Sequence, residues 1–271
     1  MDIVLTPIGL RGLAGFGGLL LFMAIETLSP FRKRVDPVLR HYGINLLIAG
    51  GNALLVGTFL GGTVGIYAGF LSGKKIGLLH LLPVGLGWNI LLSLLYFDFV
   101  TYLWHIGYHR LPILWRLHRV HHTDRDLDVT SASRFHLGEI FLSTLFRLGA
   151  MTLWGPALIS ILIFEGVLLA AAQFQHSNFR VPAPLEPALR LLLVTPDMHR
   201  VHHSDLPEET NANFSTIFSC WDRFFRTYRI VPQESIVIGL REYPNPEDRT
   251  LGRLIRMPFG PACGKEMLEA K

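Results

Sequence analysis

Four long apolar stretches constrain the fold of this chain more than any other feature. They include residues 13–28, 43–71, 81–104 and 140–174. A helix needs about 20 largely apolar residues to cross a bilayer, and these stretches meet or approach that length. Half of the 271 residues are hydrophobic and only 17% are charged, which is too apolar for a soluble domain with a solvated surface. We therefore expect an all-α, polytopic membrane helical bundle of about four to five spans.

Breaks within and after these stretches predict where the membrane spans end or turn. The basic segment Arg32-Lys33-Arg34 follows the first stretch without a cleavage pattern, so we interpret residues 13–28 as a retained span. Gly50-Gly51 and Gly61-Gly62 interrupt the second stretch, which is either one long tilted span or a short hairpin. Gly155-Pro156 lies in the middle of the fourth stretch and predicts a hairpin turn.

Basic segments and the polar regions predict sidedness and domain organisation. Lys and Arg concentrate in residues 32–40 and 110–134, which the positive-inside rule places on the cytoplasmic side. We expect N-terminal transmembrane spans over residues 1–96 and a catalytic region with further spans over residues 97–230. Residues 231–271 would form a cytoplasmic C-terminal tail. A cytoplasmic helical cap would then hold the polar residues that lie between spans.

Ten of the twelve histidines lie between residues 105 and 203, most of them in spaced groups. His105 and His109 are four apart, so on a helix their rings lie on one face. The pentapeptide His-Arg-Val-His-His occurs twice, at residues 118–122 and 199–203, and its histidines also meet on one helical face. The grouped residues are His105, His109, His118, His121, His122, His199, His202 and His203. The duplicated motif predicts two matching halves of one site.

Imidazole chemistry makes this pattern a metal-site prediction. Neutral imidazole is a good ligand for iron, zinc, copper and nickel. One zinc ion is usually satisfied by four protein ligands, so ten imidazoles exceed what one ion can use, and we predict a site for two metal ions. The isolated His136 and His176 are predicted to complete the ligand set. We interpret His41 and His80, outside the histidine-rich region, as interfacial residues.

Ligating histidines generally donate their second ring nitrogen to a carboxylate or carbonyl oxygen. Candidates for such partners are Asp98, Asp124, Asp205, Glu139 and Asn178. Asp98 lies seven residues before His105 and therefore on the same helical face. A charge within an apolar span is costly, which favours a functional role for Asp98.

Other classes of site and partner lack support in the sequence. Cys220 and Cys263 show no CxxC spacing, so neither a disulfide framework nor a thiolate zinc site is indicated. The arginines form no continuous basic stripe, so nucleic acid is not an expected partner. No flavin, haem or iron–sulfur motif is visible, and an oxidative reaction would therefore need an external electron donor.

At these motifs the sequence resembles the fatty acid hydroxylase superfamily, the membrane group that includes sterol desaturases, sterol C4-methyl oxidases, carotenoid hydroxylases and alkylglycerol monooxygenase. The resemblance covers about residues 97–228. It rests on the histidine groups and on Asp98, Tyr102, Arg134-Phe135-His136, Glu139 and the closing Trp221-Asp222-Arg223-Phe224-Phe225-Arg226-Thr227-Tyr228. Two departures are Ile106, where the family commonly has Arg, and Leu137, where it commonly has Pro.

The resemblance implies a non-haem di-iron centre that uses O2 to hydroxylate or desaturate a lipid such as a sterol or fatty acyl chain. It implies as iron ligands the eight grouped histidines, completed by His136 and His176. Zinc could occupy the same imidazoles in purified protein. A separate reductase or electron carrier would be a partner. The lipid and its reacting carbon, the choice between hydroxylation and desaturation, and the oligomeric state stay open.

Two other accounts use the same histidines differently. A membrane cytochrome would hold haem between histidines deep in facing spans, whereas these histidines occur at predicted span ends and in polar segments. A zinc-dependent membrane hydrolase, or a non-catalytic metal-binding membrane protein, is the third account, although no HExxH helix is present. The ending Met267-Leu268-Glu269-Ala270-Lys271 has no obvious endoplasmic reticulum retrieval signal, which favours a bacterial inner membrane with the metal site facing the cytoplasm.

Overall fold

The computed structural model describes residues 7–60 and 62–260, and these residues form helices and loops without a β-strand. The longer helices are α1 (Pro7–Leu28), α2 (Val38–Leu60), α3 (Thr63–Lys74), α4 (Leu86–Arg110), α6 (Leu137–Trp154) and α7 (Leu158–His176). The shorter ones are α5 (Pro112–His122), α8 (Glu186–Leu192), α9 (Pro196–His202), α10 (Pro207–Thr210), α11 (Cys220–Phe224) and α12 (Leu251–Arg256). Single 3-10 turns cover Leu78–Leu81, Val129–Ser133, Gln233–Ser235, Pro246–Arg249 and Met257–Phe259. The all-α prediction is thus confirmed for the described residues.

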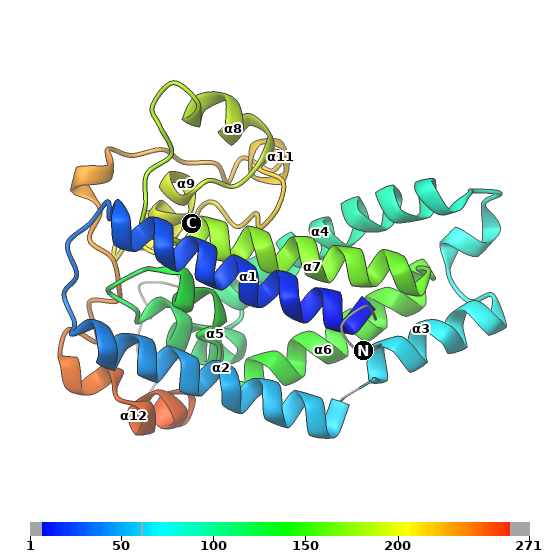
Figure 1. Cartoon of the computed structure of the whole chain (residues 1–271), viewed down its shortest axis with the longest axis horizontal. Helices are drawn as coiled ribbons and strands as arrows, with labels where there is room; N and C mark the ends of the chain where they lie inside the picture. The colour runs from blue at the N-terminus through cyan, green and yellow to red at the C-terminus, as the bar shows by residue number, and fades with distance from the viewer. Residues whose placement is uncertain (1–6, 61, 261–271) are drawn as a thin grey trace.

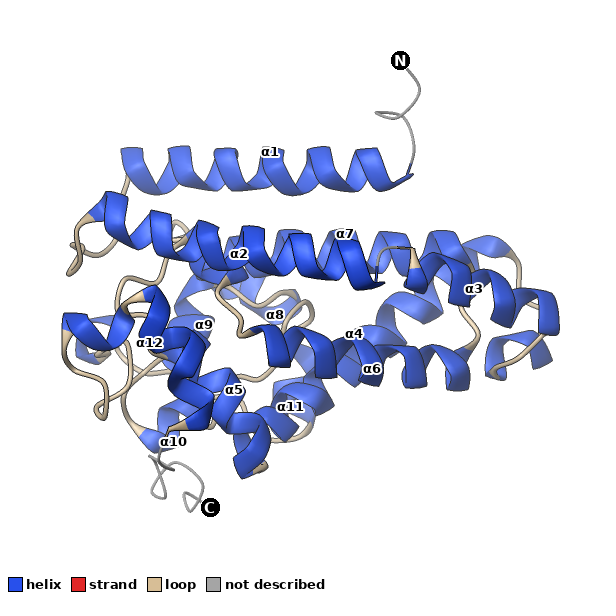
Figure 2. Cartoon of the chain, turned by 90° about the horizontal axis from the view of Figure 1, so that it is seen from below, coloured by secondary structure: helices blue, strands red, loops and turns tan. Residues whose placement is uncertain are grey.

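The long helices run side by side, and the short ones gather at one end. α1, α2, α6 and α7 follow the long axis of the molecule, and α3 lies at one end of it (Figure 1). The short helices α5, α9 and α12 lie at the opposite end (Figure 2). We call residues 29–37, 111–136 and 177–260 the cap. The chain therefore reaches the cap three times, after α1, after α4 and after α7.

Glycines set two of the breaks between long helices. Gly155, with φ of 71°, ends α6 in the left-handed region, and α7 then returns to the cap. A side chain at Gly155 would also collide with the Ile76 carbonyl oxygen, 2.4 Å from an added Cβ. The hairpin predicted at Gly155-Pro156 is therefore confirmed. Gly62, with φ of 78°, precedes α3, whereas α2 continues through Gly50-Gly51 without a break.

Two helices of the described chain, α4 and α7, are long and apolar enough to cross a membrane. Residues 15–28 of α1 form a shorter apolar helix. Leu20, Leu47 and Trp88 are examples of large apolar side chains exposed on the long helices. Many exposed large apolar side chains are unfavourable in water, which favours an apolar phase around these helices.

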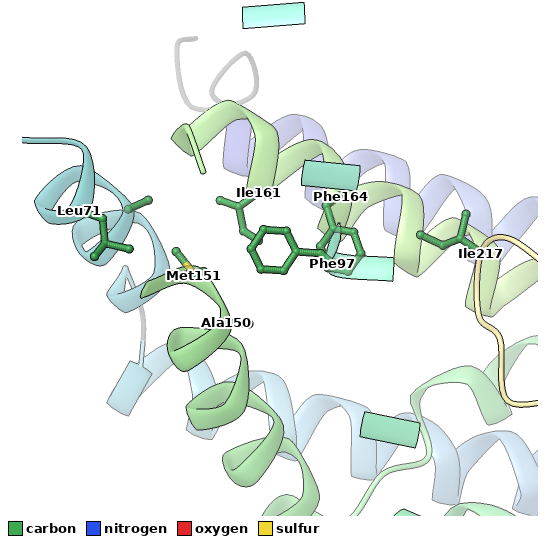
Figure 3. Packing of buried hydrophobic residues seen from close by; sticks show 8 residues of the cluster. Leu71, Phe97, Ala150, Met151, Ile161, Phe164 and Ile217 are labelled. Carbon is green, nitrogen blue, oxygen red and sulfur yellow. The ribbon is translucent and has the colours of Figure 1, made fainter. Parts of the chain in front are cut away.

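The main hydrophobic core joins the long helices to each other and to the cap. Phe97 of α4 and Phe164 of α7 lie with ring centroids 5.3 Å apart, next to Met151 of α6 and Ile161 (Figure 3). Ile217 extends this cluster into the cap. Burying a large apolar side chain contributes about 1.5–3 kcal/mol, so this cluster fixes the helices that position the histidines.

Residues 231–260, predicted to belong to a cytoplasmic C-terminal tail, pack onto the rest of the cap. Ile236 is buried against Leu127 and Val201, and Leu254 and Met257 are buried against Val120 of α5. The segment therefore supports α5 and the helices beside it. Cys263 lies outside the described residues.

Candidate metal centre

Nine of the ten predicted ligand histidines form two groups in the cap and at the adjoining helix ends. Group A contains His105, His109, His118, His122 and His202. Group B contains His121, His176, His199 and His203. In each group the candidate ligand nitrogens lie within 4.8 Å of one another. The groups are neighbours, since the rings of His122 and His203 are 4.5 Å apart.

Four helices supply these side chains. The cap end of α4 carries His105 and His109, one turn apart, and α7 ends at His176. α5 carries the first copy of the pentapeptide. α9 carries the second copy as far as His202, and His203 is its C-cap. Pro112 and Pro196 lie in the first turns of α5 and α9, where the missing N–H costs nothing, so both short helices begin at defined positions.

Each copy of the pentapeptide contributes to both groups. In the first copy, His118 and His122 belong to group A and His121 to group B. In the second copy, His199 and His203 belong to group B and His202 to group A. The first and fifth positions lie one turn apart and share a group, while the fourth position points to the other group. The two halves of the site are therefore interlocked, and neither copy forms a half by itself.

The ring nitrogens of each group converge. In group A the Nε2 atoms of His105 and His122 each lie 3.2 Å from Nε2 of His118. In group B the Nε2 atom of His176 lies 3.1 Å from that of His121 and 3.0 Å from that of His199. Two nitrogens that each lie about 2.1 Å from one ion are about 3.0 Å apart when they subtend a right angle. The spacing therefore fits ligands of a shared ion.

Backbone carbonyls fix which nitrogen of several rings faces the centre. The Nδ1 atoms of His105, His176 and His202 donate to the carbonyls of Phe214, Ala172 and Ala212, at 2.8, 2.7 and 2.8 Å. A carbonyl only accepts, so these rings carry their proton on Nδ1 and direct an Nε2 lone pair inward. Converging lone pairs repel unless a cation lies between them, which is the arrangement expected of metal ligands.

Unpartnered nitrogens also fit a metal. Among the described residues, both ring nitrogens of His109 and the Nε2 atom of His202 are buried without a hydrogen-bond partner. A buried polar atom without a partner is destabilising by about 1–3 kcal/mol. A bound cation would satisfy one nitrogen of His109 and the Nε2 atom of His202, and would remove the penalty at those two atoms. The donor set, imidazole without thiolate, suits iron and zinc.

Burial keeps the cap histidines neutral. It lowers the pKa of each histidine on α5 and α9 well below the usual value, and neighbouring histidines lower it further. The residues concerned are His118, His121, His122, His199, His202 and His203. A neutral imidazole is the form that binds a metal, so the site is ready to bind at neutral pH.

His136 belongs to neither group, so the expectation that it completes the ligand set has to be corrected. It is the N-cap of α6, where Nδ1 accepts from the backbone N–H of Gly138 at 3.0 Å. Its Nε2 lies 3.1 Å from the carbonyl of Ile255. Both ring nitrogens are thus engaged by backbone. His176, the other isolated histidine, lies in group B as expected.

Glu139 has the predicted position of a ligand partner. Its Oε1 lies 2.6 Å from Nδ1 of His118, and both side chains are buried. A carboxylate at this distance orients the ring and increases the basicity of the opposite nitrogen. Tyr108 stacks on the same ring, with centroids 4.9 Å apart, and further restricts its orientation.

The predictions for Asp98 and Asn178 have to be corrected, because both bind loop segments and not histidines. Asp98 accepts from the backbone N–H groups of Ile217 and Phe218 and from the Trp221 indole at 2.8 Å. It thereby holds the loop that carries Phe214, the carbonyl partner of His105. The Asn178 side chain accepts from the backbone N–H of Arg32 at 3.0 Å and donates to the Arg32 carbonyl at 2.9 Å.

Asp205 and Asp124 also have partners other than the grouped histidines. Asp205 pairs with Arg241 at the surface, at 2.9 Å. Asp124 is fully buried and lies 2.8 Å from Nε2 of His41, while Asn45 and Ser131 donate to its other oxygen. Burial opposes ionisation of Asp124, but His41 and Arg134 reverse this and lower its pKa far below the usual value.

His41, in the first turn of α2, is a buried structural residue that contacts the cap, and the interfacial interpretation was wrong. The residue is 3% exposed, and its two ring nitrogens lie 2.8 Å from Asp124 and 3.0 Å from Asp128.

Asp222 is a further residue that spacing did not reveal. It accepts from the backbone N–H groups of Phe214 and Ser215 at 2.8 and 2.9 Å, so it holds the same loop as Asp98. The Trp221-Asp222 pair in the closing motif was the sequence signal that could have identified Asp222 as a functional residue.

An apolar cavity of about 310 Å³ leads to the histidines between α4, α6 and α7. His105 and His118 of group A and His121, His176 and His199 of group B line one part of it. Its apolar lining includes Phe97, Val100, Trp104, Phe135, Phe164 and Leu168. Both groups therefore border one mainly apolar cavity between the long helices.

Comparisons with known proteins point to one family. The model of the fatty acid hydroxylase family matches residues 90–227. The zebrafish (Danio rerio) alkylglycerol monooxygenase is 32% identical over 59% of this chain and 34% of its own length. The ornithine lipid hydroxylase OlsE of Rhizobium tropici is 31% identical over 55% of this chain and 44% of its own. Human cholesterol 25-hydroxylase is 29% identical over 52% of this chain and 51% of its own.

These matches have a defined extent. The chain spans between about a third and about half of the length of these three relatives, 34% to 51%. No solved structure matches it significantly. The relatives are, by name, monooxygenases and hydroxylases of different lipids, and the family match contains every histidine of groups A and B. The chain belongs to the fatty acid hydroxylase family.

Proposed function

We propose that this protein is a membrane-bound, non-haem di-iron hydroxylase of a lipid. The observation that carries the proposal is the pair of buried histidine groups with converging Nε2 atoms at the end of an apolar cavity. Family membership and the names of the relatives support hydroxylation as the reaction. The reaction inserts one atom of O2 into a C–H bond. The other oxygen atom becomes water by taking up two electrons and two protons.

Iron held by both groups would supply the activation of O2. The side chains of the protein position and protect that chemistry. Groups A and B hold their rings by backbone carbonyls and by Glu139, so little reorganisation is needed on binding. The apolar walls of the cavity exclude water from the reacting carbon and bind the chain of the lipid. The electrons would come from a separate reductase or carrier, because the sequence shows no flavin, haem or iron–sulfur motif of its own.

The protein would lie in the bacterial inner membrane with the cap on the cytoplasmic side. The apolar α4 and α7 support membrane insertion, and the basic residues of the cap support the orientation. In this position the cavity between α4, α6 and α7 would open toward the lipid phase. The substrate would then enter sideways from the bilayer, without crossing water.

The test compares lipids from cells that express the wild-type protein or a variant of one group, under air and isotopically labelled O2. His199→Ala is the group B variant, and His136→Ala is the matched control outside both groups. We expect a lipid that gains one labelled oxygen atom with wild type and with His136→Ala, but not with His199→Ala. A lipid that loses two hydrogens instead would assign desaturation. Lipid hydrolysis that continues without O2 would contradict the proposal and favour a zinc hydrolase.

A further inference from the structure

Part of the cap exposes large apolar side chains beside α4. This part comprises α8 and α11 with their flanking residues, and we call residues 185–193 and 218–230 the lobe. Leu192 is 68% exposed and Phe224 is 78% exposed. The other large apolar side chains exposed on the lobe are Leu185, Leu191, Phe225 and Ile230. Such a surface is unfavourable in water and indicates that an apolar phase or a partner covers it.

Hydrogen bonds hold the two segments of the lobe together. Oγ of Ser219 and Nη2 of Arg223 donate to the carbonyl of Arg190, at 2.7 and 2.9 Å. The backbone N–H of Ser219 donates to the Leu192 carbonyl at 3.1 Å. α8 and α11 lie close together on one side of the long helices (Figure 1). The apolar side chains of both segments therefore belong to one structural unit.

Aromatic contacts with α4 set the depth of the lobe. The Phe99 ring lies 4.9 Å from that of Trp221 and 5.8 Å from that of Phe225. The Tyr102 ring lies 5.5 Å from that of Phe225. Phe99 and Tyr102 follow Leu86, the first residue of α4, by about 20 and 24 Å along the helix axis. The apolar core of a bilayer is about 30 Å thick, so with Leu86 at its far boundary these contacts lie inside the core, about 6–10 Å from its boundary on the cap side.

The charges of the lobe suit an anionic surface. Its two acidic residues, Glu186 and Asp222, are both buried, and Glu186 pairs with Arg190 at 3.1 Å. Arg226 and Arg229 are exposed. The basic residues of the lobe are Arg190, Arg223, Arg226 and Arg229. Arginines next to exposed apolar side chains are typical of segments that lie in the membrane interface, where the long side chains reach lipid headgroups.

We propose that the lobe inserts into the cap-side leaflet of the bilayer, with Leu192 and Phe224 among the acyl chains and Arg226 and Arg229 at anionic lipid headgroups. This inference rests on the membrane location in the proposed function. The depth of the contacts with α4 favours lipid as the occupant, because lipid would already surround α4 at this level. A second copy of the chain or a protein partner would have to displace that lipid.

The lobe continues directly into the loop that supports the metal centre. Phe214, whose carbonyl accepts from His105, precedes the lobe by four residues. Thr216 of the same loop lines the apolar cavity. Insertion of the lobe would therefore fix the depth of group A and of the cavity relative to the acyl chains.

Fluorescence quenching by brominated lipids tests this inference without turnover. The full-length protein, with Cys220 and Cys263 replaced by serine, carries one fluorophore on an introduced cysteine. It is placed in nanodiscs of phosphatidylcholine and phosphatidylglycerol whose acyl chains are brominated near the headgroup. The bromine atoms quench a fluorophore that contacts the acyl chains.

Three labelled positions separate insertion from mere exposure. Phe224→Cys reports on the lobe, and Leu95→Cys reports on the exposed face of α4. Val237→Cys is the matched control, because Val237 is an exposed apolar residue of the cap outside the lobe. We expect at least about threefold more quenching at position 224 than at position 237, since interfacial segments bury their apolar face about 5–10 Å deep.

Charge variants test the lipid headgroups. Arg226→Gln combined with Arg229→Gln should reduce quenching at position 224 to the value measured in discs of phosphatidylcholine alone. Arg253→Gln combined with Arg256→Gln removes the same charge from exposed positions of α12 and should have no effect. Equal quenching at position 224 with and without phosphatidylglycerol would refute the role of the arginines.

Equal quenching at positions 224 and 237, with strong quenching at position 95, would overturn the inference and leave the proposed function intact. Absence of quenching at position 95 would refute the membrane location and the inference with it. If Phe224→Cys does not fold, a fluorophore on the native Cys220, itself exposed on the lobe, still decides. The labelled-oxygen experiment above reports separately on the proposed function.

Discussion

The bond between Glu139 and His118 gives the sharpest test of how this site is held together. The 2.6 Å contact is buried, and it fixes the His118 ring whose Nε2 lies 3.2 Å from both His105 and His122. Glu139→Ala would leave the Nδ1–H of His118 buried without a partner. The penalty is about 1–3 kcal/mol. Removing the partner of a metal-ligating histidine typically weakens metal binding about 10- to 100-fold.

We therefore expect Glu139→Ala to weaken iron binding to group A about 10- to 100-fold, with a smaller loss for Glu139→Gln, which keeps an acceptor. Group B should be affected less. Fe(II) titration of the metal-free protein against a competing chelator measures both affinities. Thr144→Val is the control on α6, because its hydroxyl donates to the Ile140 carbonyl of its own helix. Unchanged affinities in Glu139→Ala, or an equal loss in Thr144→Val, would refute the reasoning.

Three further predictions concern the support of the site and its response to pH. His136→Ala should leave the iron content unchanged and reduce the free energy of unfolding by about 1 kcal/mol through the lost N-cap, as denaturant titration can measure. Asp98→Ala should destabilise the protein by at least about 2 kcal/mol and weaken iron binding at group A, because the loop that supports His105 loses its anchor; unchanged iron affinity in a folded variant would contradict this. Burial lowers the pKa of the six cap histidines below that of the unfolded chain, about 6.5, so the metal-free protein should lose stability as the pH falls through that value. Each histidine contributes up to about 1.4 kcal/mol per pH unit, and a melting temperature independent of pH between about 7 and 5 would argue against buried neutral rings.

Histidine spacing predicted the composition of the site better than its architecture. A face of a helix follows from residue number alone, so His105 with His109, and the first and fifth positions of each pentapeptide, share a group as expected. The interlocking of the two copies could not be read from the sequence. It depends on how α5 and α9 meet, which the packing of the cap decides.

Carboxylate partners were harder to predict than ligands. Asp124 follows His122 by two residues, yet it faces His41, which is 83 positions away in sequence. Asp98 shares a helical face with His105, but the loop at residues 214–221 binds its oxygens. Sequence proximity identifies neighbours along one helix, whereas hydrogen bonds between segments depend on tertiary structure. Glu139 was found through the family motif.

Glycine positions in the sequence predicted some helix ends correctly but not others. The left-handed Gly155 ends α6 where the sequence indicated, because an αL position and a close backbone contact both require glycine. Gly50-Gly51 does not interrupt α2, since a glycine pair lowers helix propensity without forcing a break. The packing of residues 231–260 onto α5 had no periodic signal, because their buried residues are single contacts in irregular segments.

The metal content of the purified protein tests the central claim most directly. Protein purified from iron-supplemented cells should contain two iron ions per chain when groups A and B are both intact. His109→Ala should bind less iron at group A, His176→Ala should bind less at group B, and His136→Ala should keep both. One ion per chain in the wild-type protein, or loss of iron in His136→Ala to the extent seen in His176→Ala, would contradict the two-group site.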